Sequence, residues 1–234
     1  MARENEIKIS LKINLNDFIG RIETKNFKLI KTLNQTDIYF DTQKWFLYSN
    51  IAALRLRQVD NNDDSLSFKK VFYLKNINDY YIEEVEVKFP LVDQETVKEI
   101  FERLKLPYPK KDFNNRQELT EYLKQFGYYD EQVMPKIRRV YKNREDEIVI
   151  DDIEHVGTIV EMECKTNDPF KVVKTLLKPN EWKRSLEGTS YIWLKNVKGL
   201  KTHLTNLKRF KSEPDWNVWN NERDWYDKLN STNS

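Results

Sequence analysis

Side chains of like charge recur two residues apart along this sequence, where they could act together on a charged ligand. Within segments that alternate apolar and polar residues, glutamates form three such pairs and basic residues form two: Glu4 and Glu6, Glu84 and Glu86, Glu161 and Glu163, Arg55 and Arg57, and Lys136 and Arg138. Because alternate residues of a β-strand point to the same side, each pair would share one face of a strand. These faces are therefore candidates for a site that holds opposite charges together.

The two kinds of pair make joint chemical sense as a site for a metal-bound polyphosphate. Arg offers phosphate a planar, two-pronged donor, and Lys offers it a compact charge. Carboxylates in the same cavity would repel the phosphate unless a hard cation lay between them, and Mg²⁺ or Mn²⁺ prefers oxygen ligands of this kind. The pattern predicts a triphosphate held by side chains together with Mg²⁺ or Mn²⁺.

Alternation of apolar and polar residues predicts an antiparallel sheet that positions these charges. Eight segments show a period of two, near residues 4–13, 35–41, 52–59, 65–75, 80–89, 135–142, 147–152 and 157–165. Helical spacing occurs from Asn16 or Asp17 to Arg21, from Asp93 to Leu104, from Asn114 to Gln125, from Asp168 to Leu177, and after Ser190. Strands with interspersed helices predict an α+β fold.

The opposite faces of the charged strands are apolar. In the first strand, for example, Ile7, Ile9 and Leu11 alternate with Glu6 and Lys8. A sheet with one apolar face and one solvated face is the simplest interpretation. Solvated faces usually mix Ser, Thr, Gln and scattered charges, whereas these strands repeat pairs of one sign. We therefore favour a sheet that closes with its charges inward, while helices cover the apolar exterior.

The overall composition argues against several other classes of protein. A net charge of +2 with 33% charged residues does not indicate a general nucleic-acid surface, so no stable nucleic-acid partner is expected. The five glycines form no phosphate-binding loop, and Cys164, the only cysteine, excludes a disulfide framework and a thiolate zinc site. The charged N-terminus and the lack of an apolar run of about eighteen residues predict a cytoplasmic protein that does not enter the membrane.

The charged strands follow one another in an order that resembles the CYTH superfamily, which includes class IV adenylyl cyclases, thiamine triphosphatases and inorganic triphosphatases. ENEIK matches the ExExK signature of this family, and DIYFDT, ALRLR, SLSFK and EEVEV resemble its next strands. PKIRRVY, IVIDDIEHVGTIVEMECK and GTSYIWL resemble its late motifs. The resemblance extends over residues 4 to 195.

This resemblance implies an eight-stranded antiparallel β-barrel, a tunnel for triphosphate with helices packed outside. The implied triphosphate ligands are Lys8, Arg55, Arg57, Lys69, Lys136 and Arg138, of which Lys8, Arg57 and Arg138 are the candidate catalytic residues. The implied metal ligands are Glu4, Glu6, Glu161 and Glu163, with Asp151 and Glu86 as further candidates. Ile82 stands where many members have an Arg just before the glutamates of the fifth strand.

The expected organisation is a tunnel domain over residues 1–195, with a helical insert near 92–127. Residues 196–234 have no counterpart that we recognise in the family, and they carry a cluster of tryptophans. They predict a helical extension that packs on the domain or on a partner subunit, so a homodimer is possible.

Three functions remain open. Hydrolysis of a phosphoanhydride in an inorganic or organic triphosphate is favoured, because it needs only the basic cradle and the metal. A class IV adenylyl cyclase would use the same cradle to make a cyclic nucleotide and pyrophosphate, but it would also need a pocket for the base. A non-catalytic protein that binds nucleotides or polyphosphate would have less need of so many metal ligands. The candidate ligands are tripolyphosphate, thiamine triphosphate and nucleoside triphosphates.

Overall fold

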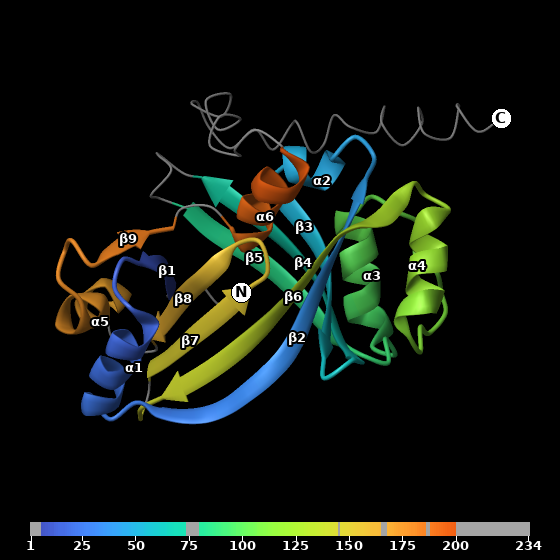
Figure 1. Ribbon diagram of the computed structural model, residues 1–234. Coiled ribbons are helices and arrows are strands. Elements are labelled where there is room, and N and C mark those ends of the chain that lie inside the picture. Colours follow the sequence, from blue (N-terminus) through green and yellow to red (C-terminus); the bar gives the residue numbers. More distant parts are fainter. Residues whose placement is uncertain (1–5, 74–79, 145, 165–167, 186–187, 200–234) are drawn as a thin grey trace. The chain divides into compact units, whose positions relative to one another are not determined.

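The computed structural model describes residues 6–73, 80–144, 146–164, 168–185 and 188–199 (Figure 1). The strands within these ranges are β1 (Glu6–Leu11), β2 (Lys28–Thr42), β3 (Ala52–Val59), β4 (Asn62–Tyr73), β5 (Tyr80–Lys88), β6 (Tyr128–Lys142), β7 (Asp146–Ile153), β8 (Gly157–Cys164) and β9 (Trp182–Arg184). The helices are α1 (Leu15–Thr24), α2 (Phe46–Ser49), α3 (Gln94–Arg103), α4 (Arg116–Lys124), α5 (Pro169–Leu176) and α6 (Thr189–Lys198). The predicted α+β class is confirmed.

The strands form an antiparallel sheet in the order β5-β4-β3-β2-β6-β7-β8-β1-β9. The prediction of eight strands was wrong by one, because β9 pairs with β1 along Trp182–Arg184. Three residues are too few to show a period of two, so the sequence pattern did not reveal this strand. The order runs from an edge at β5 to an edge at β9, so the described strands do not show the predicted closed barrel, and a tunnel stays a proposal.

Two strands are longer than predicted. β2 begins at Lys28, where residue 35 was expected, and β6 begins at Tyr128, where residue 135 was expected. The early part of β2 does not alternate, because the consecutive residues Leu29 and Ile30 are 50% and 57% exposed. β6 contains Pro135, and a proline normally argues against the interior of a strand.

The described residues divide into two compact units, each with its own apolar core. Unit 1 contains residues 37–133, and unit 2 contains residues 6–36 and 134–199. The boundary between them falls inside β2 and inside β6, so both strands contribute to both units.

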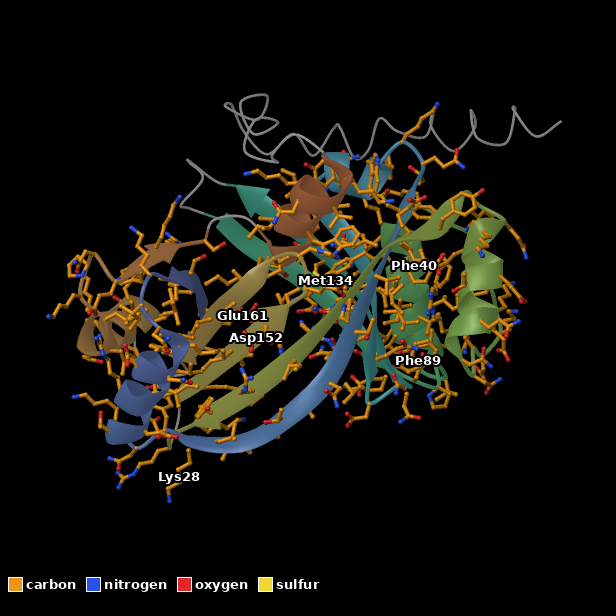
Figure 2. All side chains as sticks on the ribbon, viewed as in Figure 1. Lys28, Phe40, Phe89, Met134, Asp152 and Glu161 are labelled. Atoms are coloured by element: carbon orange, nitrogen blue, oxygen red, sulfur yellow. The ribbon has the colours of Figure 1, made fainter. Side chains whose placement is uncertain are left out.

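The core of unit 1 forms where α3 and α4 cover the apolar sides of its strands. Its buried side chains include Phe40 of β2, Leu54 and Leu56 of β3, Leu66 and Phe68 of β4, Ile100 and Phe101 of α3, and Leu119 and Leu123 of α4 (Figure 2). Asp93 caps α3 by accepting the Thr96 N–H at 3.2 Å, as the sequence predicted. This packing leaves the opposite sides of the strands to polar residues.

The core of unit 2 forms in the same way, with α1 and α5 against β1, β7 and β8. Its buried side chains include Ile7 and Ile9 of β1, Phe18 and Ile22 of α1, Ile148 and Ile150 of β7, Val160 and Met162 of β8, and Val173 of α5. Asn14 caps α1 by accepting the Asn16 N–H at 2.8 Å, so the predicted start at Asn16 or Asp17 was wrong. Asp168 caps α5 as predicted.

No helix in the described part of the chain is both long and apolar enough to cross a membrane. The predicted extension over residues 196–234 lies outside the described residues from residue 200 onward, so its role stays a prediction.

Asp41, at the end of β2, anchors the α2 turn of unit 1. Its carboxylate accepts backbone N–H bonds from Thr42 at 2.7 Å and from Leu47 and Tyr48 at 2.9 Å each. These bonds stabilise a turn that is followed two residues later by Ile51, whose positive φ of 59° is unfavourable for a β-branched residue. Burial disfavours the charged carboxylate more strongly than the three bonds favour it, and it raises the pKa of Asp41 to about 6.

Replacement of Asp41 by Asn should flatten the pH dependence of stability between about pH 4 and pH 6. The ordinary pKa of 3.8 holds in the unfolded chain, so the folded chain binds more protons within this window. The free energy of unfolding therefore falls as the pH rises, by on the order of 2–3 kcal/mol from Asp41 alone. Urea denaturation at several pH values in this window measures that pH dependence. Asp17→Asn, which changes an exposed carboxylate, is the control and should keep the slope of the unmodified protein. An unchanged slope in Asp41→Asn would contradict the assignment.

Candidate functional site

Unit 1 places three predicted triphosphate ligands on the polar side of β3 and β4. In the strand register, Arg55 lies opposite Ser67, and Arg57 lies opposite Ser65. Lys69 follows Ser67 by two residues on β4, so it points to the same side. Leu54, Leu56 and Phe68, which stand next to these residues along the strands, are buried in the core of unit 1, and this fixes the side to which the cations point.

Glu84 of β5 is shared by two of these cations. Its carboxylate lies 2.6 Å from Lys69 Nζ through Oε2 and 3.4 Å from Arg55 Nη2 through Oε1. Glu86, two residues further along β5, lies 3.6 Å from the same Arg55 nitrogen. The side chains of Arg55 and Glu84 are only 11% and 21% exposed, so little water screens their charges.

Arg57 is held by a carboxylate that the sequence analysis did not assign to the site. Its Nε and Nη2 donate to the two oxygens of Asp37 at 2.9 and 3.3 Å. Two other buried polar atoms on this face, Arg55 Nε and Ser67 Oγ, have no hydrogen-bond partner in the described part of the chain. Since buried polar groups are normally satisfied, this pair marks a place where a ligand or water would bind.

Unit 2 gathers Glu6, Lys8 and Glu161 on the polar side of β1 and β8; Figure 2 labels Glu161. Lys8 lies opposite Glu161 in the register, and its Nζ is 3.2 Å from Glu6 Oε1 and 3.3 Å from Glu161 Oε1. Burial lowers the pKa of Lys8, but the attraction of Glu161 and Glu6 outweighs it and raises the pKa well above its usual value. Lys8 is therefore a charged ammonium that two carboxylates share.

Arg138, Asp151 and Lys136 continue this face onto β7 and β6. Arg138 donates to both oxygens of Asp151, at 2.7 and 2.6 Å, and its Nη2 lies 3.3 Å from Glu161 Oε2. Lys136 Nζ lies 3.3 Å from Asp151, and these two side chains are 3% and 1% exposed. A buried charge without a partner is costly, so Asp151 serves to neutralise both cations. Its predicted role as a metal ligand stays a prediction.

The predicted metal ligands come together only in part. Glu6 and Glu161 approach the same ammonium, and Glu163 is exposed and lies opposite Glu6 in the register. Glu86 belongs to unit 1, and Glu4 lies outside the described residues. Across the described ranges, no three His, Cys, Asp or Glu side chains are arranged to hold a metal ion.

The pair Glu6 and Glu161 nevertheless suits a hard divalent cation. Mg²⁺ in enzymes commonly takes one or two carboxylates and completes its shell with phosphate oxygens and water. Two carboxylates close enough to share one ammonium fit that donor set, because a small cation could take the position between them.

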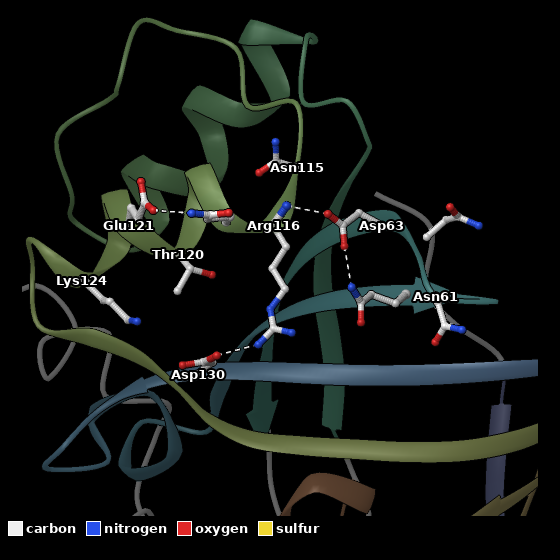
Figure 3. Close-up of a pocket in the computed structure, with 11 residues that line it drawn as sticks. Asn61, Asp63, Asn115, Arg116, Thr120, Glu121, Lys124 and Asp130 are labelled. Carbon is white, nitrogen blue, oxygen red and sulfur yellow. Dashed lines mark hydrogen bonds and ion pairs between the residues drawn. The ribbon is translucent and has the colours of Figure 1, made fainter.

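A separate polar pocket of about 700 Å³ lies in unit 1 beside the β3–β4 turn and α4 (Figure 3). Arg116, which lines it, donates to Asp130 at 2.6 Å, and its backbone N–H donates to Asp63. Asp63 also accepts a bond from Gln58 at 2.7 Å. None of the predicted triphosphate or metal ligands lines this pocket. We therefore place the candidate chemistry on the charged strand faces.

Two carboxylates that hold the cations of the site were assigned no ligand role from the sequence. Asp37 holds Arg57, and Glu84 holds Lys69 and Arg55. A signal for Glu84 was present, because it stands two residues before Glu86 and so shares its face. Asp37 could be placed only through the pairing of β2, which alternation along one strand does not specify.

Comparison with known proteins identifies related sequences. The sequence model of a family described as CYTH domain matches residues 2–190. A protein of Methanocaldococcus jannaschii named "Putative adenylate cyclase" is 28% identical over 166 residues, which cover 70% of this chain and 78% of that protein.

Solved structures share the fold at lower identity. A Pyrococcus horikoshii protein superposes with a TM-score of 0.56 at 17% identity, over 81% of this chain and 98% of its own. A Hippeastrum protein is described as a "putative adenylyl cyclase" with a dominant triphosphatase activity. It gives a TM-score of 0.54 at 22% identity, over 82% of this chain and 95% of its own. At these identities the likeness shows the fold alone.

Asp151→Asn should destabilise the protein far more than Asp152→Asn. The first change removes the carboxylate from Lys136 and Arg138, and a broken buried pair costs about 3–5 kcal/mol. Asp152 is the next residue of β7, points to the other side, and pairs with Arg139 at 2.6 Å while 34% exposed. Its loss should cost at most about 1 kcal/mol. Equal losses in the free energy of unfolding, measured by urea denaturation, would contradict the proposed neutralisation.

Proposed function

Because this chain belongs to the CYTH domain family, we propose that it is a metal-dependent enzyme that hydrolyses a phosphoanhydride bond of an inorganic or organic triphosphate. Members of the family bind triphosphate substrates and act as triphosphatases or adenylyl cyclases. The family supplies the class of substrate, and the charged faces of this chain support the more specific proposal.

The observation that carries the proposal is the charged face of unit 1, where buried donors that lack a partner among the described residues lie among three basic side chains. Arg55, Arg57 and Lys69 lie there side by side, and Arg55 Nε and Ser67 Oγ are buried without a partner in the described residues. Several cations around unsatisfied donors form an environment that attracts an anion with many acceptor oxygens. A triphosphate has that chemistry.

We propose that the basic residues implied by the family resemblance bind the triphosphate. These residues are Lys8, Arg55, Arg57, Lys69, Lys136 and Arg138. Arg57 and Arg138 each hold a carboxylate partner through Nε and Nη2, so their guanidinium groups are fixed in place and their remaining N–H groups are left to donate to phosphate oxygens. Such preorganised donors stabilise the charge that develops on phosphate oxygens during the reaction.

Glu6 and Glu161 are the residues of this chain that would hold the metal, with Glu163 and Glu4 as further ligands. When bound, a divalent metal neutralises phosphate charge and lowers the pKa of its water. In the reaction, a water molecule attacks the terminal phosphorus, the bond to the bridging oxygen breaks, and the shortened phosphate chain leaves with the bridging oxygen. The arginines and lysines stabilise the leaving oxygen, and a proton passes from the attacking water to solvent or phosphate.

Adenylyl cyclisation is the second candidate function. The Methanocaldococcus jannaschii relative, at 28% identity, carries the name of that activity. Cyclisation would use the same basic cradle while the 3′-hydroxyl of ribose attacks the α-phosphorus and pyrophosphate leaves. Hydrolysis is preferred because it needs no site for the nucleobase.

Product analysis should separate these functions. We expect the purified protein with Mg²⁺ or Mn²⁺ to release orthophosphate from at least one of tripolyphosphate, thiamine triphosphate and ATP, and to lose this activity in EDTA. Chromatography and phosphorus NMR of each reaction identify the products. Cyclic AMP with pyrophosphate would favour the cyclase, and unchanged substrates that still bind would favour a non-catalytic protein. Full turnover in EDTA would refute the requirement for metal.

Arg57→Ala and Arg138→Ala should lower kcat/KM about a hundredfold or more on every accepted triphosphate. The loss should be similar for two substrates that differ only in the attached organic group, because a guanidinium fork binds phosphate oxygens. Arg139→Ala is the matched control, since Arg139 is the next residue of β6 and pairs with Asp152 on the other side of the sheet. If one substrate kept its normal rate in Arg57→Ala or Arg138→Ala, that arginine would be binding the organic group.

A further inference from the structure

Lys8 occupies the position between two carboxylates that were both predicted to hold a metal. Its Nζ is 3.2 Å from Glu6 and 3.3 Å from Glu161, and the three side chains are 24%, 20% and 18% exposed. A single positive charge thus stands between two acidic groups in a partly desolvated face. This position suits a divalent cation equally well, because a cation there would also be attracted by both carboxylates.

The contacts around Lys8 belong to a continuous series of alternating charges across four strands. In order, its members are Glu6, Lys8, Glu161, Arg138, Asp151 and Lys136. The three cations and three carboxylates of this series cancel one another. A free metal ion or a free triphosphate alone therefore meets charges that are already compensated.

The contacts of Lys8 are looser than those of its neighbour Arg138. Charge-assisted N–H···O bonds are normally about 2.7–2.9 Å long. Arg138 meets Asp151 at 2.7 and 2.6 Å through two nitrogens, whereas Lys8 lies 3.2 and 3.3 Å from its partners. Lysine also carries its charge on a flexible four-carbon stem. Of the two cations beside Glu161, Lys8 is the one that can change partner without breaking a two-pronged pair.

We propose that Lys8 is the internal counter-ion of Glu6 and Glu161, and that it moves to a phosphate oxygen when a divalent cation takes its place between them. This inference rests on the proposed binding of a metal and a triphosphate. It assigns Lys8 a role beyond contact with phosphate, because the same ammonium then couples the two ligands. When a metal ion binds to Glu6 and Glu161, it frees the Lys8 ammonium to contact the triphosphate. When a triphosphate attracts the Lys8 ammonium, Glu6 and Glu161 become available to a metal ion. Such coupling is necessarily reciprocal for the two binding equilibria.

Binding of each ligand by itself tests the proposal without any turnover. Mn²⁺ alone is titrated into the protein and followed by the EPR signal of the free ion. Tripolyphosphate alone is titrated in EDTA by calorimetry. In Lys8→Met we expect Mn²⁺ to bind at least about tenfold more tightly, because the carboxylates lose their counter-ion, and tripolyphosphate to bind more weakly.

Two further variants control this experiment. Lys12→Met removes the same charge from an exposed position just beyond the same strand, and it should leave both affinities within about twofold. Lys8→Arg keeps a cation between the carboxylates, so Mn²⁺ should bind as weakly as it does to the unmodified protein. This variant also keeps the test valid if Lys8→Met folds poorly, because tight Mn²⁺ binding by Lys8→Arg would count against the proposal.

The result that overturns the proposal is a Lys8→Met protein that binds Mn²⁺ no more tightly than the unmodified one. Failure of the proposed function is a different outcome. In that case the unmodified protein would neither bind the preformed Mn²⁺–tripolyphosphate complex nor hydrolyse any triphosphate, whatever Lys8→Met does with Mn²⁺ alone.

Discussion

Compensation of charge within each strand face is the constraint on which this structure depends. The apolar sides of the strands are taken up by the two cores, so the charged residues must share the remaining sides. Charges removed from water are tolerated only when they are paired and hydrogen-bonded. Lys136 and Asp151, at 3% and 1% exposure, are the clearest case. The sheet can therefore hold so many charged side chains on its polar sides only because acids and bases alternate across neighbouring strands.

The two units meet this constraint with opposite arrangements. In unit 1 a single carboxylate, Glu84, lies between Lys69 and Arg55, and in unit 2 a single ammonium, Lys8, lies between Glu6 and Glu161. Each shared group has the sign of one component of a metal–triphosphate complex. The carboxylate resembles a phosphate oxygen, and the ammonium resembles the metal. Glu84 and Lys8 thus supply, from the protein's own side chains, charges of the same sign as those of the proposed ligand.

Alternation along single strands was enough to predict which residues share a face, but not which residues touch. Arg55 and Arg57 were correctly assigned to one side of β3 because the leucines that alternate with them, Leu54 and Leu56, belong in a core. The partner of Arg57 depends on the pairing of β2, a property of register that one strand does not contain. β9 was too short to show a period of two. Pro135 argued against a strand that continues through it, so the residues of β6 before Pro135 were not predicted to be part of the strand. The catalytic and metal-binding roles of these residues stay predictions, because they depend on ligands.

The position of β1 has a consequence for the way the chain acquires this arrangement during synthesis. β1 comes first along the described chain, yet it lies between β8 and β9, near the end of the described ranges. At about 5–20 residues per second, a ribosome needs roughly 8–30 s to pass from Lys8 to Glu161. Until then the nascent chain carries β1 without either of its neighbouring strands. Ile7 and Ile9 therefore lack their core partners on β7 and β8 during that interval.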